Sequence, residues 1–209
     1  MGEVHVVDHP LVQAKLTRMR DTKTSFQEFR RLLHEIGLLM SFEVTRDLQT
    51  KSVHLQTPVC DGDFPVLADE NITIVPILRA GLGMVDGLHE LIPFARVGHI
   101  GLARNEQTHE PEEYYFKMPK GYEHSVVIVV DPMLATGGSA VDAISRLKRD
   151  GCTNIRMMNL IAAPEGVAAM QSAHPDVDVY VAAIDEKLNE NAYIVPGLGD
   201  AGDRIFGTD

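Results

Sequence analysis

VVIVVDPMLATGGSA, residues 126–140, is the stretch that decides the fold of this chain. Five apolar β-formers, Val126 to Val130, are followed by Asp131 and Pro132, and then by small residues that include two adjacent glycines. From Ser139 onward, the apolar residues recur at helical spacing. The stretch therefore predicts a buried strand that ends on a carboxylate, followed by a short loop and a helix.

The loop has the composition of a phosphate-binding turn. Gly137 and Gly138 let backbone N–H groups approach an anion closely, Thr136 and Ser139 add hydroxyl donors, and the following helix N-terminus adds partial positive charge. An ordinary tight turn that merely needs glycine would explain the loop alone equally well. Asp131 favours the phosphate site, because a carboxylate at this edge of the sheet is placed to accept hydrogen bonds from vicinal hydroxyls. Together, the loop and the carboxylate predict a site for a ribose 5-phosphate.

Two other phosphate-binding loops do not match. A Walker A loop needs a lysine after its last glycine, and none follows Gly138. The nearest approach to the dinucleotide fingerprint G-x-G-x-x-G is GLGMVDG, residues 81–87, where the third glycine comes one residue late. The stretch at 126–140 therefore represents a different kind of phosphate site.

Strands and helices alternate along the rest of the chain. A capping box at Ser25 and Glu28 opens a helix, and Pro164 opens another at a favoured first-turn position. The alternation predicts an α/β fold with a parallel sheet flanked by helices, in which ligands bind beyond the carboxyl ends of the strands. We expect helices at 25–48, 81–93, 139–151 and 164–175, an alternating strand at 52–59, and apolar strands at 72–78, 95–103, 126–130, 155–163 and 177–183.

Residues 104–124 are polar, contain prolines and have an aromatic-rich middle, which predicts a protruding flap or β-arm. Tyr114, Tyr115 and Lys117 in this segment either close over a ligand and exclude water or pack on another subunit, and the sequence leaves both open. The length of 209 residues suits one domain, residues 1–209, with this flap and a glycine-rich C-terminal segment at 185–209.

Charge and composition exclude several classes of protein. The formal net charge of -11 argues against a protein whose main task is binding nucleic acid. No apolar run approaches membrane-spanning length, and the N-terminal residues lack a signal-peptide pattern. Cys60 and Cys152 fit no C-x-x-C pattern, and the nine histidines are not paired at metal-ligand spacing. We therefore expect a cytoplasmic protein with no nucleic-acid or membrane partner and no metal ligands of its own.

The opening stretch resembles the signature that binds PRPP (5-phosphoribosyl diphosphate) in the type I phosphoribosyltransferases. It departs from most of that superfamily in one respect, because Pro132 stands where a second acid is usual. The form DPMLATGGS, with YIVPGLGDAGDRIFGT at residues 193–208, is similar to the uracil phosphoribosyltransferase family. The segments DHPLVQAKLTRMRD, residues 8–21, and ILRAGLGM, residues 77–84, are similar to that family too, so the resemblance covers essentially the whole chain.

This resemblance implies a reaction of pyrimidine salvage, in which the phosphoribosyl group of PRPP is transferred to N1 of uracil to give UMP and pyrophosphate. It implies a type I phosphoribosyltransferase-like fold with the C-terminal segment binding the base. It also implies Mg²⁺ carried mainly by PRPP, a homodimer or larger homo-oligomer, and GTP as a candidate allosteric activator.

The resemblance also assigns roles to residues of this chain. The catalytic residues are Arg79, Asp131 and Asp200. The uracil-binding residues are Ile194, Gly199, Asp200 and Ala201, and backbone groups there suit the acceptor–donor–acceptor edge of the base. The PRPP-binding residues are Arg79, Arg104, Asp131, Pro132, Met133, Leu134, Ala135, Thr136, Gly137, Gly138, Ser139 and Asp200.

Simpler interpretations stay open for individual residues. Arg79 and Arg104 could pair with surface acids or be solvated, Asp200 could only stabilise a turn, and the C-terminal segment could be a glycine-rich surface loop. Two other functions also compete. An RNA-binding pyrimidine attenuation regulator keeps the same fold but requires a basic face, and orotate as the base would require extra cationic groups that the C-terminal motif lacks.

Overall fold

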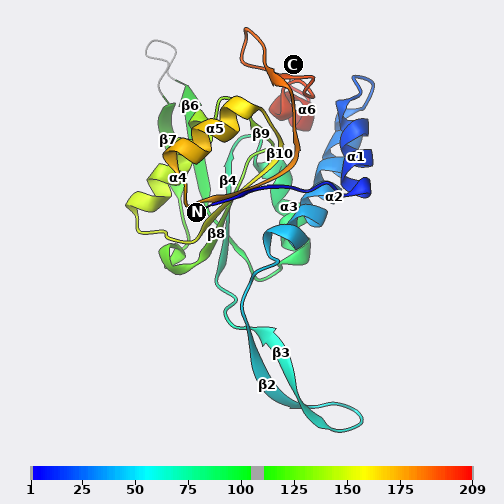
Figure 1. Cartoon of the computed structure of the whole chain (residues 1–209), viewed down its shortest axis with the longest axis vertical. Helices are drawn as coiled ribbons and strands as arrows, with labels where there is room; N and C mark the ends of the chain where they lie inside the picture. The colour runs from blue at the N-terminus through cyan, green and yellow to red at the C-terminus, as the bar shows by residue number, and fades with distance from the viewer. Residues whose placement is uncertain (1, 105–110, 209) are drawn as a thin grey trace.

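A sheet of mostly parallel strands forms the centre of the computed structural model, which describes residues 2–104 and 111–208 (Figure 1). The strand order is β1-β11-β10-β8-β4-β6-β7, with β5 beside β4 and β9 beside β10. Only β6 and β7 pair antiparallel within this sheet. The strands are β1 (Val4–Val6), β4 (Ile72–Leu78), β5 (Arg96–Val97), β6 (His99–Arg104), β7 (Pro111–Lys117), β8 (Val126–Val130), β9 (Met133–Leu134), β10 (Ile155–Ala162) and β11 (Asp178–Ile184).

Helices cover both faces of the sheet, which confirms the predicted α/β fold. On one face lie α1 (Pro10–Arg20), α2 (Phe26–Val44) and α3 (Leu82–Leu91), and on the other lie α4 (Gly138–Arg149) and α5 (Pro164–Ala173). Ser25 caps α2 by accepting the N–H of Glu28 at 3.3 Å, and Pro164 occupies the first turn of α5, as the sequence predicts. A 3₁₀ turn (Tyr122–His124) and a short α6 (Ala201–Phe206) complete the helical elements.

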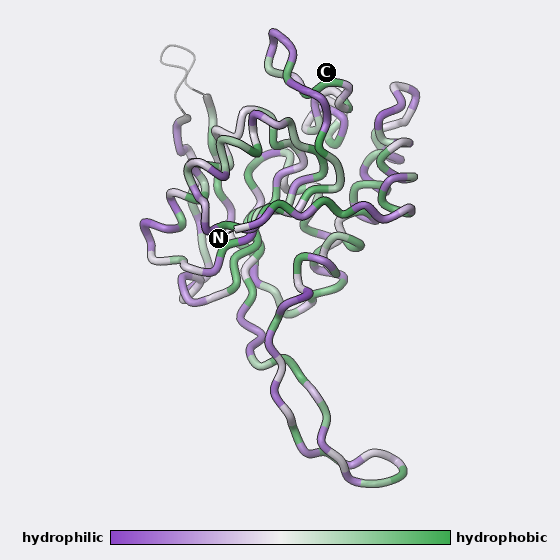
Figure 2. The backbone as a smooth tube through the Cα atoms, in the orientation of Figure 1, coloured by the Kyte–Doolittle hydropathy of each residue, from purple (hydrophilic) through white to green (hydrophobic). Residues whose placement is uncertain are grey.

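The central strands are buried on both faces because their side chains alternate between two hydrophobic cores. In β8, Ile128 and Val130 face the core formed with α1, α2 and α3, while Val127 and Val129 face the core formed with α4 and α5. This two-sided burial explains why the strand is an unbroken apolar run rather than an alternating one. Figure 2 shows hydrophobic residues concentrated in these central strands.

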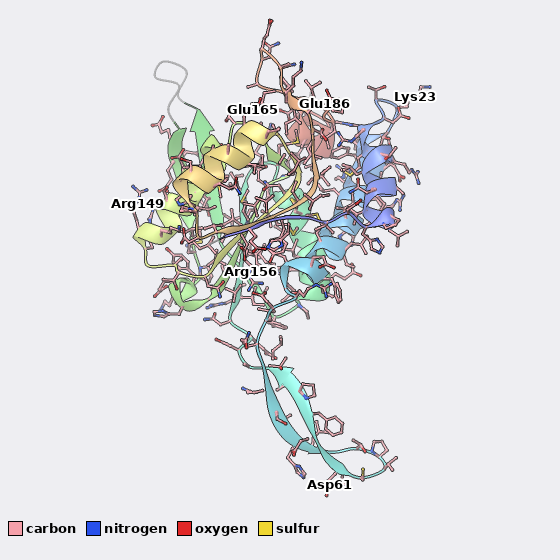
Figure 3. The ribbon with its side chains drawn as sticks, in the orientation of Figure 1. Lys23, Asp61, Arg149, Arg156, Glu165 and Glu186 are labelled. Carbon is pink, nitrogen blue, oxygen red and sulfur yellow. The ribbon has the colours of Figure 1, made fainter. Side chains whose placement is uncertain are left out.

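A β-arm protrudes from the body of the molecule, and it consists of β2 (Thr50–Gln56) and β3 (Asp61–Leu67). Asp61 lies near its far end (Figure 3). The strand predicted at 52–59 is therefore corrected: it ends at Gln56, and it pairs with β3 rather than joining the main sheet. The arm points away from the end of the molecule at which α6 lies (Figure 1).

The segment predicted as a flap, 104–124, contributes β7 to the edge of the main sheet. Residues 105–110 lie outside the described residues, so a flap that closes over a ligand stays a prediction. None of the helices in residues 2–104 and 111–208 combines the length and apolar character needed to span a membrane.

Candidate active site

A cavity of about 450 Å³ opens where β4 and β8 end, at the edge of the sheet where parallel α/β folds bind ligands. Three segments far apart in the sequence form its walls. They are the turn after β4, the loop after β8 and the C-terminal segment around α6. The lining residues are Arg79, Ala80, Asp131, Met133, Ala135, Asn191, Ala192, Tyr193, Ile194, Gly199, Asp200, Ala201 and Gly202.

The loop after β8 has the geometry of an anion-binding turn. Gly137 is the N-cap of α4 and adopts φ +85°, a conformation that favours glycine. No side chain caps α4, so the N–H groups of its first turn have no intrahelical partner and point out of the helix start. Thr136, Gly138 and Ser139 are exposed and follow Ala135, the last residue of this loop that lines the cavity.

This loop is held against α5 by a close backbone contact. A Cβ on Gly166 would lie 2.5 Å from the carbonyl oxygens of both Leu134 and Ala135, closer than any real contact. The predicted PRPP residues Pro132 and Leu134 are buried and do not line the cavity, so they act as the support of the loop. Only glycine at position 166 lets the backbone of this loop pack so closely on α5. The sequence analysis did not identify Gly166.

Asp131 is half-buried at the end of β8 and lines the cavity. The pKa of Asp131 is raised to about 7, mainly because the carboxyl group is buried. A hydrogen bond of 3.3 Å from the N–H of Met133 lowers this pKa, and the negative charge of Asp200 raises it. The backbone carbonyl of Asp131 accepts a hydrogen bond of 2.7 Å from the Asn159 side chain, which fixes the end of the strand. Such a shift is typical of functional carboxyl groups.

Arg79 follows β4 directly and lines the same cavity, and its role in binding PRPP stays a prediction. Its guanidinium lies 3.8 Å from a carboxylate oxygen of Asp203, and its side chain is 61% exposed. An ion pair this exposed is weak, so Arg79 is free to turn toward an anionic ligand. Gly81 makes the turn after β4 possible, since a Cβ there would lie 2.4 Å from the carbonyl oxygen of Val130.

The C-terminal segment brings the predicted base-binding residues to the cavity. A small hairpin of β12 (Lys187–Leu188) and β13 (Ile194–Val195) precedes α6, and Ile194, Gly199 and Ala201 all line the cavity. Asp200 is exposed and caps α6, because its side chain accepts the N–H of Asp203 at 2.9 Å. The turn-stabilising role left open for Asp200 is therefore present, alongside its place in the cavity wall.

The cavity also contains residues that the sequence analysis missed, and it leaves one prediction outside the described part of the chain. Asn191, Ala192 and Tyr193 line the wall because the β12–β13 hairpin folds back over the cavity. Asn191 and Ala192 directly precede the C-terminal motif and Tyr193 is its first residue, but the sequence analysis assigned none of the three a role. Arg104 ends β6, and its side chain lies outside the described residues, so its contact with PRPP stays a prediction.

The donor set of this site suits a divalent cation that arrives with a substrate. In the described ranges, 2–104 and 111–208, no group of three or more His, Cys, Asp or Glu side chains is placed to bind a metal ion. Asp131 and Asp200 nevertheless line one cavity, and the charge of one raises the pKa of the other. Mg²⁺ commonly uses one or two carboxylates together with substrate phosphates and water, so these two residues fit such an ion.

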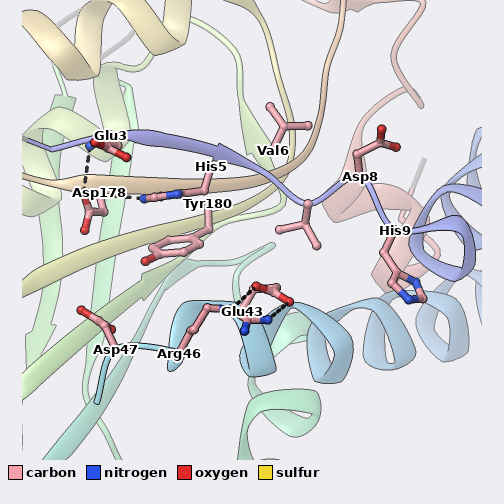
Figure 4. Close-up of a pocket in the computed structure, with 11 residues that line it drawn as sticks. Glu3, His5, Val6, Asp8, His9, Glu43, Arg46, Asp47, Asp178 and Tyr180 are labelled. Atoms are coloured by element: carbon pink, nitrogen blue, oxygen red, sulfur yellow. Dashed lines mark hydrogen bonds and ion pairs between the residues drawn. The ribbon is translucent and has the colours of Figure 1, made fainter. Parts of the chain in front are cut away.

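A larger cavity, of about 820 Å³, lies beside β1, the edge strand of the sheet, and the end of α2 (Figure 4). Its charged lining is mainly acidic, since Arg46 is its one arginine or lysine and is already bonded to Glu43 at 2.7 and 2.8 Å. Of the remaining acids there, Asp47 pairs with Arg156 from outside the lining, whereas Glu3, Asp8 and Asp178 have no arginine or lysine partner among the described residues. This surplus of negative charge does not suit a phosphorylated substrate, so size alone does not identify the active site.

Comparisons with known proteins show the family to which this chain belongs. The family model described as uracil phosphoribosyltransferase matches residues 6–208. Proteins named uracil phosphoribosyltransferase from Staphylococcus epidermidis and Bacillus licheniformis are each 61% identical over 208 residues, covering 100% of both chains. A solved structure from Aquifex aeolicus superposes with a TM-score of 0.92 at 35% identity, covering 99% of each chain. A hypoxanthine phosphoribosyltransferase from Staphylococcus aureus shares the fold alone, with a TM-score of 0.54 at 14% identity over 82% of this chain and 80% of that one.

Proposed function

This chain belongs to the uracil phosphoribosyltransferase family, and we propose that it transfers the 5-phosphoribosyl group of PRPP to N1 of uracil in pyrimidine salvage. The bond between ribose C1 and the pyrophosphate oxygen breaks, and a bond from C1 to N1 of uracil forms. Pyrophosphate leaves, the N1 proton is lost to solvent, and UMP is the product. One observation carries the proposal: a single cavity joins the phosphate loop, the turn with Arg79 and the C-terminal segment.

The loop at 131–139 suits the ribose 5-phosphate end of PRPP. The N–H groups at the start of α4 can bind the 5-phosphate, supported by the helix dipole, and the Gly138 N–H makes only a long hydrogen bond of 3.5 Å to the Thr136 hydroxyl. Asp131 lies at the cavity end of this loop, where its carboxylate can accept hydrogen bonds from the ribose hydroxyls. An ionised Asp131 is required for this role, which makes its raised pKa directly relevant to substrate binding.

Arg79 suits the pyrophosphate end, since its exposed guanidinium projects from the turn after β4 on the cavity. Negative charge develops on the departing pyrophosphate, so a cation placed there stabilises the transition state more than the substrate. When bound, Mg²⁺ supplies further positive charge on the pyrophosphate oxygens. Asp131 and Asp200 are the residues that would hold it, mainly through PRPP.

The C-terminal segment suits uracil because it offers backbone groups rather than long side chains. Uracil presents O2, N3–H and O4, and the main chain around Ile194, Gly199 and Ala201 can match that edge. Cytosine has an amino donor in place of O4 and has no N3 proton. Two groups of the site would then be mispaired, and sites of this kind discriminate by roughly 10⁴-fold or more.

The experiment that tests the proposal is release of pyrophosphate from PRPP and Mg²⁺ with uracil, cytosine, orotate or hypoxanthine added in turn. Of the four bases, we expect only uracil to give pyrophosphate release and to form UMP. Comparable kcat/KM values for uracil and cytosine would contradict recognition by the backbone edge, and an absence of UMP would contradict the function itself.

The RNA-binding alternative has no support from the relatives, whose names describe an enzyme, and the net charge of -11 argues against it. A homo-oligomeric state, activation by GTP and a cytoplasmic location complete the proposal and rest on the family resemblance. Sedimentation of the purified protein, with assays at increasing GTP, tests the first two directly.

A further inference from the structure

The base-binding segment is anchored at Gly197 by a buried ion pair. Arg20, at the end of α1, donates to both carboxylate oxygens of Asp185, at 2.7 and 2.6 Å. Arg20 also donates to the carbonyl oxygen of Gly197 at 2.7 Å, and the N–H of Gly197 donates to Asp185 at 2.9 Å. One ion pair therefore engages both backbone groups of a single residue, and the Asp185 side chain in it is only 5% exposed.

Gly197 occupies a turn that controls its neighbours on both sides. It adopts φ +64°, and a Cβ there would lie 2.1 Å from the carbonyl oxygen of Ile194. Ile194 and Gly199, which stand three residues before it and two after it, both line the cavity. Fixing Gly197 therefore fixes the backbone on either side of the base.

A second guanidinium ties the next residue to the same end of α1. Arg204 donates to the carbonyl oxygen of Leu198 at 2.9 Å, to that of Asp21 at 2.8 Å, and to that of Met19. The consecutive residues Gly197 and Leu198 are thus both held by the last turn of α1 and the residue that follows it. α1 lies in the N-terminal part of the sequence and the base-binding segment in the C-terminal part, so this contact joins two segments that are far apart in the sequence.

We propose that Arg20 is a positioning residue for the base: through Asp185 it holds Gly197, and so places the backbone of Ile194 and Gly199 that reads uracil. The inference rests on the proposed function, because it concerns the same base-binding segment. Recognition by backbone groups depends on what holds the backbone, because a backbone group cannot readjust by changing its rotamer as a side chain can. Misplacement of such a site by about 1 Å can cost on the order of 10²-fold in rate.

The expected signature is a loss specific to the base. In Arg20→Ala, KM for uracil should rise roughly 10-fold or more, while KM for PRPP at saturating uracil stays within about 3-fold. The preference for uracil over cytosine should fall as well. Arg20→Lys should be intermediate, because one ammonium cannot bind Asp185 with two nitrogens and hold Gly197 at the same time.

Arg156→Ala is the matched control, because Arg156 has a similar arrangement elsewhere in the molecule. Its guanidinium lies 2.6 Å from Asp47 and donates to the carbonyl oxygen of Val44, at the end of α2. Its side chain is 7% exposed, against 24% for Arg20, so its loss should cost at least as much stability. If Arg20 has only a structural role, KM for uracil and KM for PRPP should change to the same extent in both variants.

Chemical rescue gives a further readout, since the partly exposed Arg20 leaves an opening when truncated. Methylguanidinium at millimolar concentration should lower KM for uracil in Arg20→Ala and leave Arg156→Ala unchanged. If Arg20→Ala does not fold, Arg20→Lys and Asp185→Asn carry the same comparison. A wild-type KM for uracil in these variants, or a parallel rise in both KM values as in the control, would overturn the inference. A wild-type protein that forms no UMP would instead overturn the proposed function.

Discussion

Asp131 and Asp200 are two carboxyl groups on one cavity, and their surroundings differ. Asp131 is half-buried at a strand end, and burial raises its pKa to about 7. Asp200 is exposed and caps α6. The charge of Asp131 therefore changes with pH in the physiological range. For Asp200, experiments must distinguish its helix-capping role from its proposed role in catalysis.

Asp131→Asn should make the substrate-free protein more stable at pH 8 than the wild type. Between about pH 4 and 7 the folded wild type keeps a proton that the unfolded chain has lost, so its stability falls as pH rises and then levels off above 7. The upper limit, from the difference between 3.8 and about 7, is roughly 4 kcal/mol, and partial exposure of the carboxyl should reduce the effect to about 2 kcal/mol. Urea unfolding at pH 4 and pH 8 measures it.

We expect kcat/KM of the wild type for PRPP to rise with pH toward 7, and in Asp131→Asn this kcat/KM should be low and should lose that rise. Thr136→Val is the control, because it removes a hydroxyl from the phosphate loop and leaves the Asp131 carboxyl in place, so its profile should keep that rise. An unchanged profile in Asp131→Asn would mean that its carboxyl does not bind the ribose hydroxyls.

Asp200→Asn should separate the cap from the chemistry. Asn caps helices about as well as Asp, so the free energy of unfolding should stay within about 0.5 kcal/mol, whereas Asp200→Ala should lose about 1 kcal/mol. If the charge acts on PRPP or its Mg²⁺, kcat should fall on the order of 10²-fold in Asp200→Asn with little change in KM for uracil. Steady-state kinetics and urea unfolding of both variants decide this, and near-normal kcat in Asp200→Asn would leave a capping role alone.

At the scale of elements, a substitution of Gly166 tests whether the close packing of the phosphate loop on α5 matters for PRPP binding. A Cβ in Gly166→Ala would lie 2.5 Å from two carbonyl oxygens of the loop, so the loop or the helix must move. We expect KM for PRPP to rise at least 10-fold, with KM for uracil changing less. Gly37→Ala, in α2, has no positive φ and would place its Cβ no closer than 3.5 Å to a neighbour, so it controls for the general cost of replacing a helical glycine. Equal changes for both substrates would argue against a specific role of this packing.

The elements that the sequence predicted are those with a strong local pattern. β4, β8 and β10 are apolar runs because both of their faces are buried, and α2 has a cap and a continuous apolar stripe. β12 and β13 have two residues each, which is too short for any periodicity. The β-arm of β2 and β3 was not predicted, because its second strand, DGDFPVL, contains glycine, aspartate and proline, the usual markers of loops.

The candidate site was predictable to the same extent. Asp131 and Arg79 follow apolar strands, so their place at the carboxyl edge follows from the topology of a parallel sheet. The base-binding residues came from the resemblance to a family rather than from periodicity. The pair of Arg20 and Asp185 spans 165 residues and has no local pattern, so only the folded chain brings it together.

At the scale of the whole molecule, the candidate active site is formed by the middle of the chain and its C-terminal segment, which α1 holds. In the proposed function, the loop after β8 binds the phosphate and the C-terminal segment binds the base. A product that contains both a phosphate and a base must therefore touch both segments at once. Uracil alone needs only the C-terminal segment, and ribose 5-phosphate needs only the loop after β8.

Hydrogen exchange should show this division directly. UMP should slow amide exchange at least 10-fold both at residues 137–140, where the N–H groups at the start of α4 have no intrahelical partner, and at residues 194–201. Uracil should protect only the second segment, and ribose 5-phosphate only the first. The β-arm at 50–67, far from the cavity, is the internal control and should exchange at the same rate in every sample. Protection by UMP at 194–201 without protection at 137–140 would mean that the phosphate binds elsewhere, and the loop after β8 would then be an ordinary turn.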